Sequence, residues 1–186
     1  MKIRLHAFEP GSRANGPGLR AVIWMQGCSL GCPECFNPGS HDLVGGSEAD
    51  TLVLANRILS GKPRVEGISI SGGEPFQQPN ALLDLLTRLD GAGLSRLVFS
   101  GYTLREIKAQ TFGPPILEHL DVVIAGRYVA SQYEGKALLG SANQKIHLLT
   151  PRHRPEEFGA VPTSEVILHP DGSITLTGIR PLRLPS

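Results

Sequence analysis

All the cysteines of the chain lie in one short stretch, GCSLGCPECFNP, at residues 27–38. Cys28, Cys32 and Cys35 follow a C-x3-C-x2-C spacing, and an odd number of thiols so close together does not suit a loop-closing disulfide framework. Three thiolates on one loop can instead converge on a soft metal centre. A redox or nucleophilic thiol would need a single cysteine, so the stretch predicts a metal site first.

Two kinds of metal centre fit these cysteines. Structural zinc takes four ligands, and His41 follows Cys35 closely enough to complete a Cys3His site. Iron–sulfur cubanes usually take four cysteines, and this sequence has three. A cubane on three cysteines leaves one iron without a protein ligand, which is a liability toward oxygen unless something else binds there. The cysteines alone leave the choice open.

The composition is that of a soluble globular domain. The 186 residues are 40% apolar and 19% charged, with a formal net charge of +1. This balance indicates neither a nucleic-acid partner nor an anionic membrane surface. Residues 1–20 contain no apolar core of signal-peptide length, and no apolar run approaches the roughly 20 residues that span a bilayer. We therefore expect a cytoplasmic protein with reduced thiols.

Extended apolar segments alternate with helical ones along most of the chain. The predicted strands are Leu19–Gln26, Gly67–Ser71, Leu94–Ser100, Leu120–Ala125 and, as a fifth, Lys145–Leu149. The predicted helices are Ser47–Leu59, capped by Ser47 or Asp50, a helix opened by Pro79 and ended by Gly91 and Gly93, and Thr103–Gln110. Repeated strand-then-helix order predicts parallel βα units.

The end of the chain has a different pattern. Residues 164–179 (SEVILHPDGSITLTGI) alternate around Pro170-Asp171-Gly172, which predicts a β-hairpin. A connector rich in proline and arginine precedes it at residues 151–162. We therefore expect a core domain at residues 1–150 and a C-terminal extension with this hairpin at residues 151–186.

The distinctive motifs all follow predicted strands. The cysteines follow the first strand and Gly72–Glu74 the second, while Gly101-Tyr102 and Gly126-Arg127 follow the third and fourth. In parallel sheets the chemistry gathers beyond the carboxyl ends of the strands. This shared placement predicts one composite site.

Taken in order, these motifs resemble the radical S-adenosylmethionine (SAM) enzymes, and among them the small activating proteins of anaerobic ribonucleotide reductase. The counterparts of the family motifs are Asn15–Gly18, Gly27–Asn37, Ser71–Pro75, Ser100–Tyr102, Ala125–Arg127 and Gly140–Gln144. Most radical SAM enzymes have an aromatic residue just before the third cysteine. Here Glu34 stands there and the aromatic residue, Phe36, follows Cys35, as in the reductase activators.

The resemblance implies a role for each motif. Cys28, Cys32 and Cys35 would hold three irons of a [4Fe-4S] cluster, and the fourth iron would bind the amino and carboxylate groups of SAM. Gly72 and Gly73 would let backbone groups approach the methionine amino group, with Glu74 as a nearby acceptor or structural tie. The other implied cofactor-binding residues are Glu34, Phe36, Ser100, Tyr102, Gly126, Arg127 and Asn143.

One position departs from the family pattern. Arg127 would meet the SAM carboxylate in a charge-assisted pair. Two residues earlier the family usually has Asp, and this chain has Ala125.

The amides of Asn143 and Gln144 could bond either the cofactor or the backbone. No acid–base catalyst is expected, because hydrogen abstraction by a radical does not require one.

The resemblance implies an α/β fold, namely a partial (open) βα barrel of the radical SAM type with an added C-terminal β-hairpin. It implies reductive cleavage of SAM to a 5′-deoxyadenosyl radical, which would install a glycyl radical on a partner such as anaerobic ribonucleoside-triphosphate reductase. A flavodoxin or ferredoxin-type protein would donate the electron. A small-molecule or peptide substrate is the first alternative, and a non-catalytic zinc-binding interaction module is the second.

Overall fold

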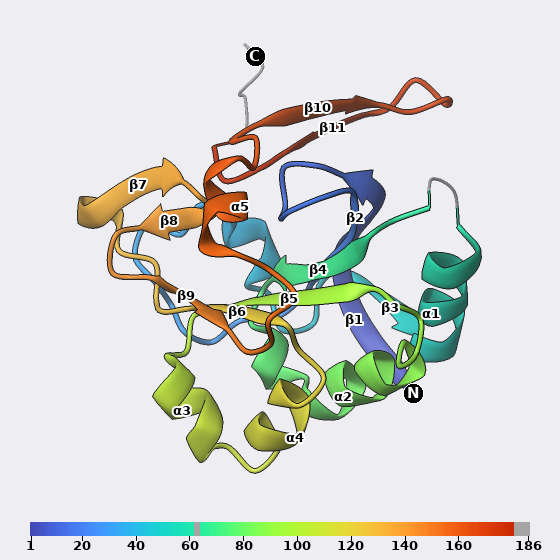
Figure 1. The fold of residues 1–186 in the computed structure, drawn as a ribbon, viewed down its shortest axis with the longest axis horizontal. Coiled ribbons are helices and arrows are strands. Elements are labelled where there is room, and N and C mark those ends of the chain that lie inside the picture. Colours follow the sequence, from blue (N-terminus) through green and yellow to red (C-terminus); the bar gives the residue numbers. More distant parts are fainter. Residues whose placement is uncertain (62–63, 181–186) are drawn as a thin grey trace.

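The protein is a mixed α/β fold built on one large sheet (Figure 1). This computed structural model describes residues 1–61 and 64–180. The large sheet contains β1 (Lys2–Ser12), β2 (Arg20–Met25), β3 (Ser47–Asp50), β4 (Gly67–Gly72), β5 (Ser95–Ser100), β6 (Val122–Ala125) and β9 (Lys145–Leu148). Two separate hairpins are formed by β7 (Tyr133–Lys136) with β8 (Leu139–Ser141), and by β10 (Glu165–Leu168) with β11 (Ile174–Thr177).

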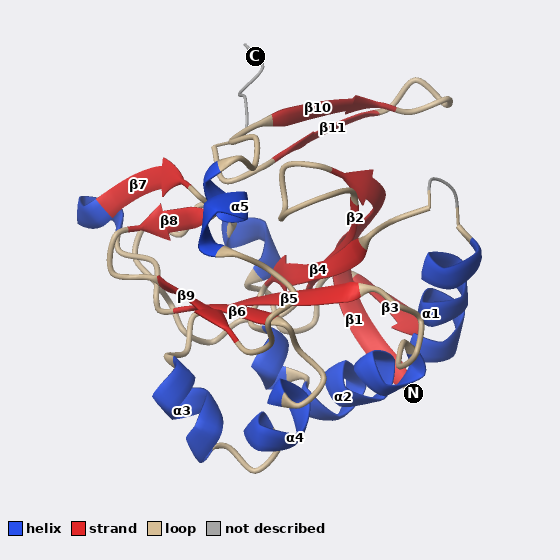
Figure 2. Ribbon diagram, viewed as in Figure 1, coloured by secondary structure: helices blue, strands red, loops and turns tan. Residues whose placement is uncertain are grey.

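The helices are short and connect successive strands (Figure 2). They are α1 (Thr51–Ser60), α2 (Pro79–Arg88), α3 (Leu104–Ala109), α4 (Gly113–Leu117) and α5 (Pro155–Gly159), with 3-10 turns at Pro38–Ser40, Pro75–Gln77 and Ala130–Gln132. Within the described residues, none of these helices has the length and apolar character needed to cross a membrane.

The strand order confirms the predicted parallel βα units. The sheet runs β3-β1-β2-β4-β5-β6-β9, and its central strands β2, β4, β5 and β6 are parallel. The outer strands β1, β3 and β9 are antiparallel to their neighbours. In the described part of the chain β3 and β9 do not pair with each other, so the sheet is open.

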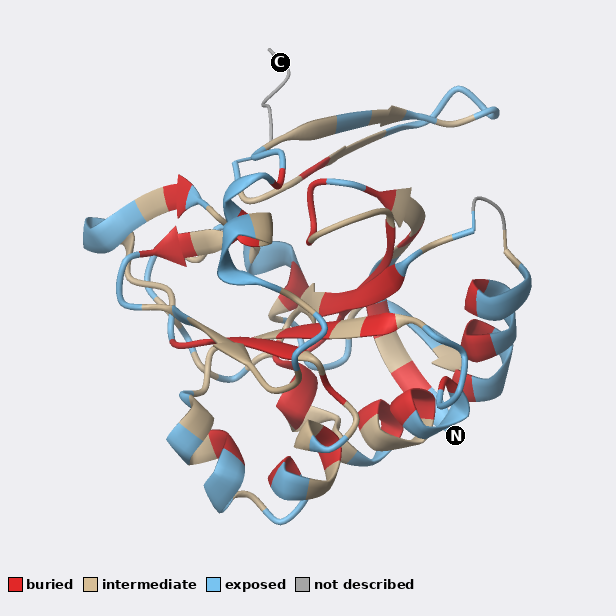
Figure 3. Ribbon diagram, in the orientation of Figure 1, coloured by how far each residue is buried: buried red, intermediate tan, exposed pale blue. Residues whose placement is uncertain are grey.

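The two faces of the sheet are covered by different parts of the chain. Helices α1 to α4 pack on one face, around buried side chains that include Ile23, Ile70 and Val98 (Figures 1 and 3). On the other face α5 inserts Phe158, which is 1% exposed, against Val122 and its neighbours. The C-terminal segment therefore completes a second core on the face that the helices leave open.

Local signals set most element boundaries as predicted, with one correction. The Asp50 side chain accepts a hydrogen bond from the Leu52 N–H at 2.8 Å and caps α1. Residues 47–50 are not helical: they form β3 and pair with β1. The prediction of a helix from Ser47 was wrong because this pairing joins segments that are distant in sequence. The long strand β1 was missed for the same reason.

The predicted C-terminal hairpin is confirmed and is fastened to the sheet. Its strands pair from Glu165 with Thr177 to Leu168 with Ile174. The Glu165 carboxylate accepts hydrogen bonds from the Ser12 hydroxyl at 2.5 Å and from the Arg13 backbone N–H at 2.9 Å. The hairpin is therefore anchored at the end of β1.

The second core generates a stability prediction. Phe158→Ala should lower the free energy of unfolding by about 3–5 kcal/mol, because it removes a fully buried aromatic ring and leaves a cavity. Urea unfolding followed by the fluorescence of Trp24, the single tryptophan, measures this loss. Phe112 is 36% exposed, so Phe112→Ala is the control and should cost about 1 kcal/mol or less. Equal losses in the two variants would contradict a structural role for α5.

Candidate active site

A pocket of about 320 Å³ lies at the carboxyl ends of the parallel strands. Cys28, Cys32 and Cys35 all line it, and they follow β2 in the chain. Residues 71–74 at the end of β4, Ser100 and Gly101 at the end of β5, and Gly126 after β6 line it as well. The composite site predicted from the order of the motifs is therefore present as one cavity.

The end of β4 packs directly on the residue that precedes the cysteines. The Gly73 N–H donates to the Met25 carbonyl at 2.7 Å, and the Glu74 N–H donates to the Gly27 carbonyl at 2.9 Å. A Cβ at Gly73 would lie 2.2 Å from that carbonyl oxygen. Gly72 has a φ of 97°, a region that favours glycine. Both glycines are thus required by the chain's own packing.

Glu74 connects the ends of β4 and β5. It is 1% exposed, and its carboxylate accepts hydrogen bonds from the Phe76 N–H at 3.0 Å, the Ser100 hydroxyl at 2.9 Å and the Gly101 N–H at 2.8 Å. Removal from water raises the pKa of the Glu74 carboxyl to about 7, although these hydrogen bonds favour its charged form. In this structure Glu74 is a structural tie between two motifs.

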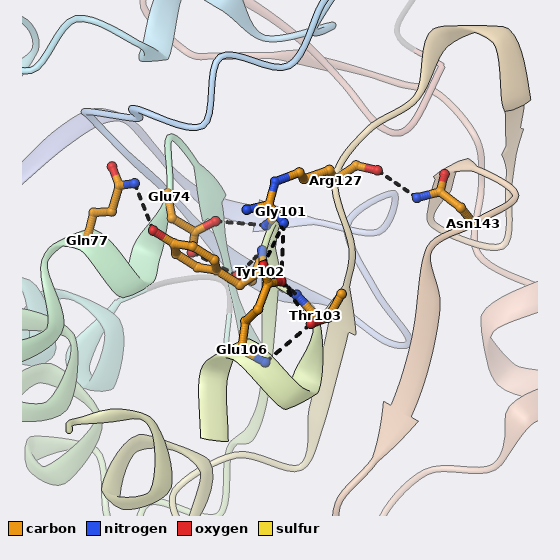
Figure 4. Close-up of polar contacts among 9 residues, drawn as sticks. Glu74, Gln77, Gly101, Tyr102, Thr103, Glu106, Arg127 and Asn143 are labelled. Atoms are coloured by element: carbon orange, nitrogen blue, oxygen red, sulfur yellow. Dashed lines mark hydrogen bonds and ion pairs between the residues drawn. The ribbon is translucent and has the colours of Figure 1, made fainter. Parts of the chain in front are cut away.

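The cysteine loop is tied to the rest of the site by Gln77. The Gln77 side chain accepts a hydrogen bond from the Ser29 N–H at 3.0 Å and donates to the Ser29 hydroxyl at 2.8 Å. The same amide donates to the Tyr102 hydroxyl at 3.1 Å (Figure 4). Glu34 has a φ of 55°, in a turn where the Cys35 N–H donates to the Cys32 carbonyl.

The cysteines fit a cluster better than a single ion. In the described residues, no three His, Cys, Asp or Glu side chains lie close enough together to hold one metal ion, although His41 lines the same pocket. A four-iron cluster spreads its thiolates further apart, because each cysteine binds a different iron. Burial raises the pKa of the Cys28 and Cys35 thiols, so metal binding there must release their protons.

Arg127 is held at the edge of the site. Its guanidinium lies 3.0 Å from one Glu106 carboxylate oxygen and 3.2 Å from the other, and 5.7 Å from the centre of the Tyr102 ring (Figure 4). Hydrogen bonds from Thr103 and the Arg127 charge lower the pKa of Glu106 to about 2. Arg127 therefore has an ionised partner in this structure, and its predicted role toward SAM stays a prediction.

The amides of Asn143 and Gln144 bond the backbone after β6. Asn143 donates to the Arg127 carbonyl at 2.8 Å, and Gln144 donates to the Gly126 carbonyl at 2.9 Å. Gln144 also accepts from the Gly140 N–H at 2.8 Å. These side chains fix the course of the chain between β6 and β9 in this structure, and a contact of either amide with the cofactor stays a prediction.

Most of the predicted site residues line the pocket, and several others line it unexpectedly. Phe36 does so, packed edge-on against Tyr128 with ring centres 5.4 Å apart. The side chains of Glu34, Tyr102, Arg127 and Asn143 lie outside the lining. Lining residues that the sequence did not indicate include Trp24, Phe99, Tyr128 and residues 175–179. The strand pattern could have indicated Trp24 and Phe99, because every second residue of a strand faces the same side of the sheet.

The buried Glu74 carboxyl makes stability depend on pH. Its pKa is about 7 when folded against an ordinary value of 4.5, so the folded protein binds a proton that the unfolded chain has lost between these two values. Relative to Glu74→Gln, the wild type should therefore lose about 3 kcal/mol of stability as the pH rises through this window. Urea unfolding from pH 4.5 to 7.5 measures the difference.

Glu118 is exposed and provides the control for this titration. The stability difference between the wild type and Glu118→Gln should stay constant over the same pH range. A constant difference for Glu74→Gln as well would contradict the raised pKa.

Comparison with known proteins identifies the family. Residues 14–147 match the family described as a 4Fe-4S single cluster domain. The chain is 30% identical over 157 residues to the anaerobic ribonucleoside-triphosphate reductase-activating protein of Salmonella typhimurium, covering 79% of this chain and 99% of that protein. The protein of the same name from Vibrio cholerae is 30% identical over 154 residues, with 78% and 97% covered.

A larger relative shares the same region. The pyruvate formate-lyase-activating enzyme of Clostridium pasteurianum is 32% identical over an alignment of 126 residues. This alignment covers 65% of this chain, and the chain spans 50% of that enzyme's length. The family confirms the predicted [4Fe-4S] cluster and SAM as cofactors and favours them over the zinc alternative. This chain belongs to the radical SAM activating proteins that carry a single 4Fe-4S cluster domain.

Proposed function

We propose that this protein activates a glycyl radical enzyme of the anaerobic ribonucleoside-triphosphate reductase type. The observation that carries the proposal is the pocket itself. All three cysteines line it together with the end of the SGGEP motif, in a chain that matches a reductase-activating protein over 99% of that protein's length. The partner enzyme would offer a glycine, whose Cα is accessible because no side chain covers it.

We assign the cluster to Cys28, Cys32 and Cys35. The bound cofactors supply the chemistry: one electron cleaves SAM to methionine and a 5′-deoxyadenosyl radical, which takes the glycine Cα hydrogen. The chain positions this reaction and keeps water out. The Gly73 and Glu74 backbone fixes the start of the cysteine loop, and Leu30 of that loop covers Gly101.

The remaining predicted residues would surround SAM from the neighbouring strand ends. Phe36 and Glu34 flank Cys35 in the sequence, and Ser100, Gly126 and the aromatic Tyr102 belong to the next strand ends. Arg127 would exchange its contact with Glu106 for the SAM carboxylate, in the two-pronged geometry that guanidinium groups favour. Asn143 would act through the backbone carbonyl of Arg127, to which it already donates.

The type of fold, the electron donor and the cellular location are part of the same proposal. The open sheet would be a partial βα barrel of the radical SAM type, formed by a core at residues 1–150. Residues 151–186 would be an added unit, of which residues 181–186 lie outside the described part of the chain. A flavodoxin or ferredoxin-type protein would donate the electron, and the protein would work in the cytoplasm. The absence of a long apolar helix in the described residues is compatible with this location.

A second candidate function keeps the chemistry and changes the substrate. Residues 175–179 of the C-terminal segment line the pocket, and they lie beyond the region that matches the family. Beside the three cysteines, this added wall would also bound the site of a smaller substrate. A small molecule or a peptide is therefore the alternative substrate.

The cluster assignment is tested by matched substitutions. Cys28→Ala, Cys32→Ala or Cys35→Ala should each abolish iron and sulfide binding on anaerobic reconstitution and stop release of 5′-deoxyadenosine from SAM. His41→Ala is the control, because His41 lines the same pocket and would be a ligand only in a Cys3His zinc site. It should keep its iron. With dithionite, SAM and the partner enzyme, the wild type should give a glycyl radical signal in electron paramagnetic resonance.

The outcomes separate the candidate functions. Loss of the metal in His41→Ala, with zinc and no iron in the wild type, would contradict the cluster assignment. Cleavage of SAM that a small metabolite stimulates, without a radical on the partner enzyme, would favour the alternative substrate.

Arg127→Ala should weaken SAM binding by about 10- to 150-fold and leave the iron content unchanged, because a charge-assisted hydrogen bond contributes about 1.5–3 kcal/mol. Titration of the reconstituted protein with SAM, followed by the change in the cluster's electron paramagnetic resonance spectrum, measures the affinity. Arg105→Ala is the control, because Arg105 is an exposed arginine on the same helix as Glu106. Equal affinity in both variants would remove Arg127 from the SAM site.

A further inference from the structure

One wall of the pocket comes from the C-terminal hairpin. Thr175, Leu176, Thr177, Gly178 and Ile179 all line the pocket that holds the three cysteines. Among the described hairpin residues, only those of β11 and the two that follow it do so. The family match ends at residue 147, so this wall is not part of the shared domain.

The part of β11 that borders the pocket is its edge. Successive side chains of a strand point to opposite faces, so a face would contribute only every second residue. Here three successive residues of the strand, Thr175, Leu176 and Thr177, border the cavity, and the next two residues of the chain do so as well. In the described residues β11 pairs with β10 alone, in a two-stranded sheet. Its other edge therefore carries backbone groups without a strand partner.

The register of the hairpin shows which backbone groups these are. The His169 N–H donates to the Ser173 carbonyl at 2.9 Å, so these two residues form a hydrogen-bonded pair at the turn. Hydrogen-bonded and non-hydrogen-bonded pairs alternate along antiparallel strands. Ile174, opposite Leu168, and Leu176, opposite Val166, thus belong to the non-hydrogen-bonded pairs. Their N–H and C=O groups point away from β10.

Two contacts hold this edge in place. At the base of the hairpin, the buried Asn15 amide donates to the Thr177 hydroxyl at 2.9 Å. Near the turn, the His169 ring lies 3.3 Å from the carboxylate of Glu9, whose side chain is 4% exposed. Because the hairpin is fixed at both ends, its free edge is a constant part of the pocket wall.

We propose that β11 binds the substrate as an extended polypeptide segment, which pairs with its free edge as a third strand of the hairpin sheet. This inference rests on the proposed function, because it describes how the glycine-bearing segment of the partner reaches the pocket. A row of alternating donors and acceptors matches another peptide backbone. A glycine in that segment brings its Cα close to the wall without a clash.

The outer face of the hairpin supports the same occupant. Val166 (48% exposed), Leu168 (75%) and Ile174 (51%) are aliphatic and exposed, and the register places all three on one face. The face is continuous with the pocket through Leu176, which shares this side and lines the cavity. A polypeptide paired with β11 extends this sheet and places its own side chains beside Ile174 and Leu176.

The test uses the anaerobically reconstituted enzyme and a synthetic probe, a fluorescently labelled nine-residue peptide of Thr and Val with one central Gly. Leu176→Pro removes an N–H on the β11 edge and should weaken binding by at least about tenfold in fluorescence anisotropy. Val166→Pro is the matched control: Val166 is the cross-strand partner of Leu176, and its N–H points from the opposite edge of the hairpin. It should change binding by less than about twofold.

A second measurement leaves the enzyme unaltered, in case Leu176→Pro disturbs the hairpin. Peptides N-methylated at every second residue, in the two possible registers, are compared on the wild type. One register should lose binding by at least about tenfold and the other should not, because only one set of amides faces β11. Equal effects of both proline variants, or of both methylation registers, would overturn the inference.

The inference and the proposed function fail differently. A wild type that releases 5′-deoxyadenosine from SAM but binds none of the peptides overturns the inference and leaves the proposed function intact. A wild type that binds the peptide in one register but never cleaves SAM overturns the proposed function and keeps the docking edge.

Discussion

The site depends on one close backbone contact, between the end of β4 and the residue that introduces the cysteines. Because the Gly73 and Glu74 N–H groups bond the carbonyls of Met25 and Gly27, the cysteine loop begins at a fixed place against β4. The contact admits no side chain, since a Cβ at Gly73 would overlap the Gly27 carbonyl. From there the Glu74 carboxylate continues the connection to the end of β5. Three motifs that are distant in sequence are thereby held together at one end of the sheet.

The sequence indicated this site well because its signals are local. Asp50, Pro79 and Thr103 mark helix starts with side chains or rings that act within one turn, and the structure places helices directly after or at them. The motifs follow strands whose parallel order brings their carboxyl ends together. The segments that were wrong or missed, β1 and β3, pair with each other across many intervening residues. The alternation of polar and apolar residues in β1 and β3 identifies them as strands only when the partner strand is known.

The residues of the pocket, like the strands, were predicted from the sequence only in part. The sequence placed the cysteines and the glycines correctly beside one another, because motif order fixes them. It did not indicate that Glu106, which caps α3, would also hold Arg127, or that β11 would form a wall. Both contacts join side chains or strands from separate motifs, and neither leaves a periodicity in its own segment. Gly72 and Gly73 show a related point: the need for a glycine at these positions is visible only in the fold, where Met25 packs against Gly72 and Gly27 against Gly73.

Packed side chains close the amino ends of the central strands, at the end of the sheet opposite the pocket. At the amino ends of the strands, the guanidinium of Arg20 is fully buried and bonds the Ser69 and Ser95 hydroxyls at 2.7 Å. Its pKa falls to about 10, the expected result of burying a cation without an adjoining carboxylate. Phe158 fills the space above Val122 on the face that helices α1 to α4 leave open. The pocket lies at the opposite, carboxyl ends of the strands, where Thr175, Leu176 and Thr177 of β11 line it. The added C-terminal segment therefore contributes to the structure in two ways: α5 packs Phe158 on the face of the sheet opposite the helices, and residues 175–179 line the pocket.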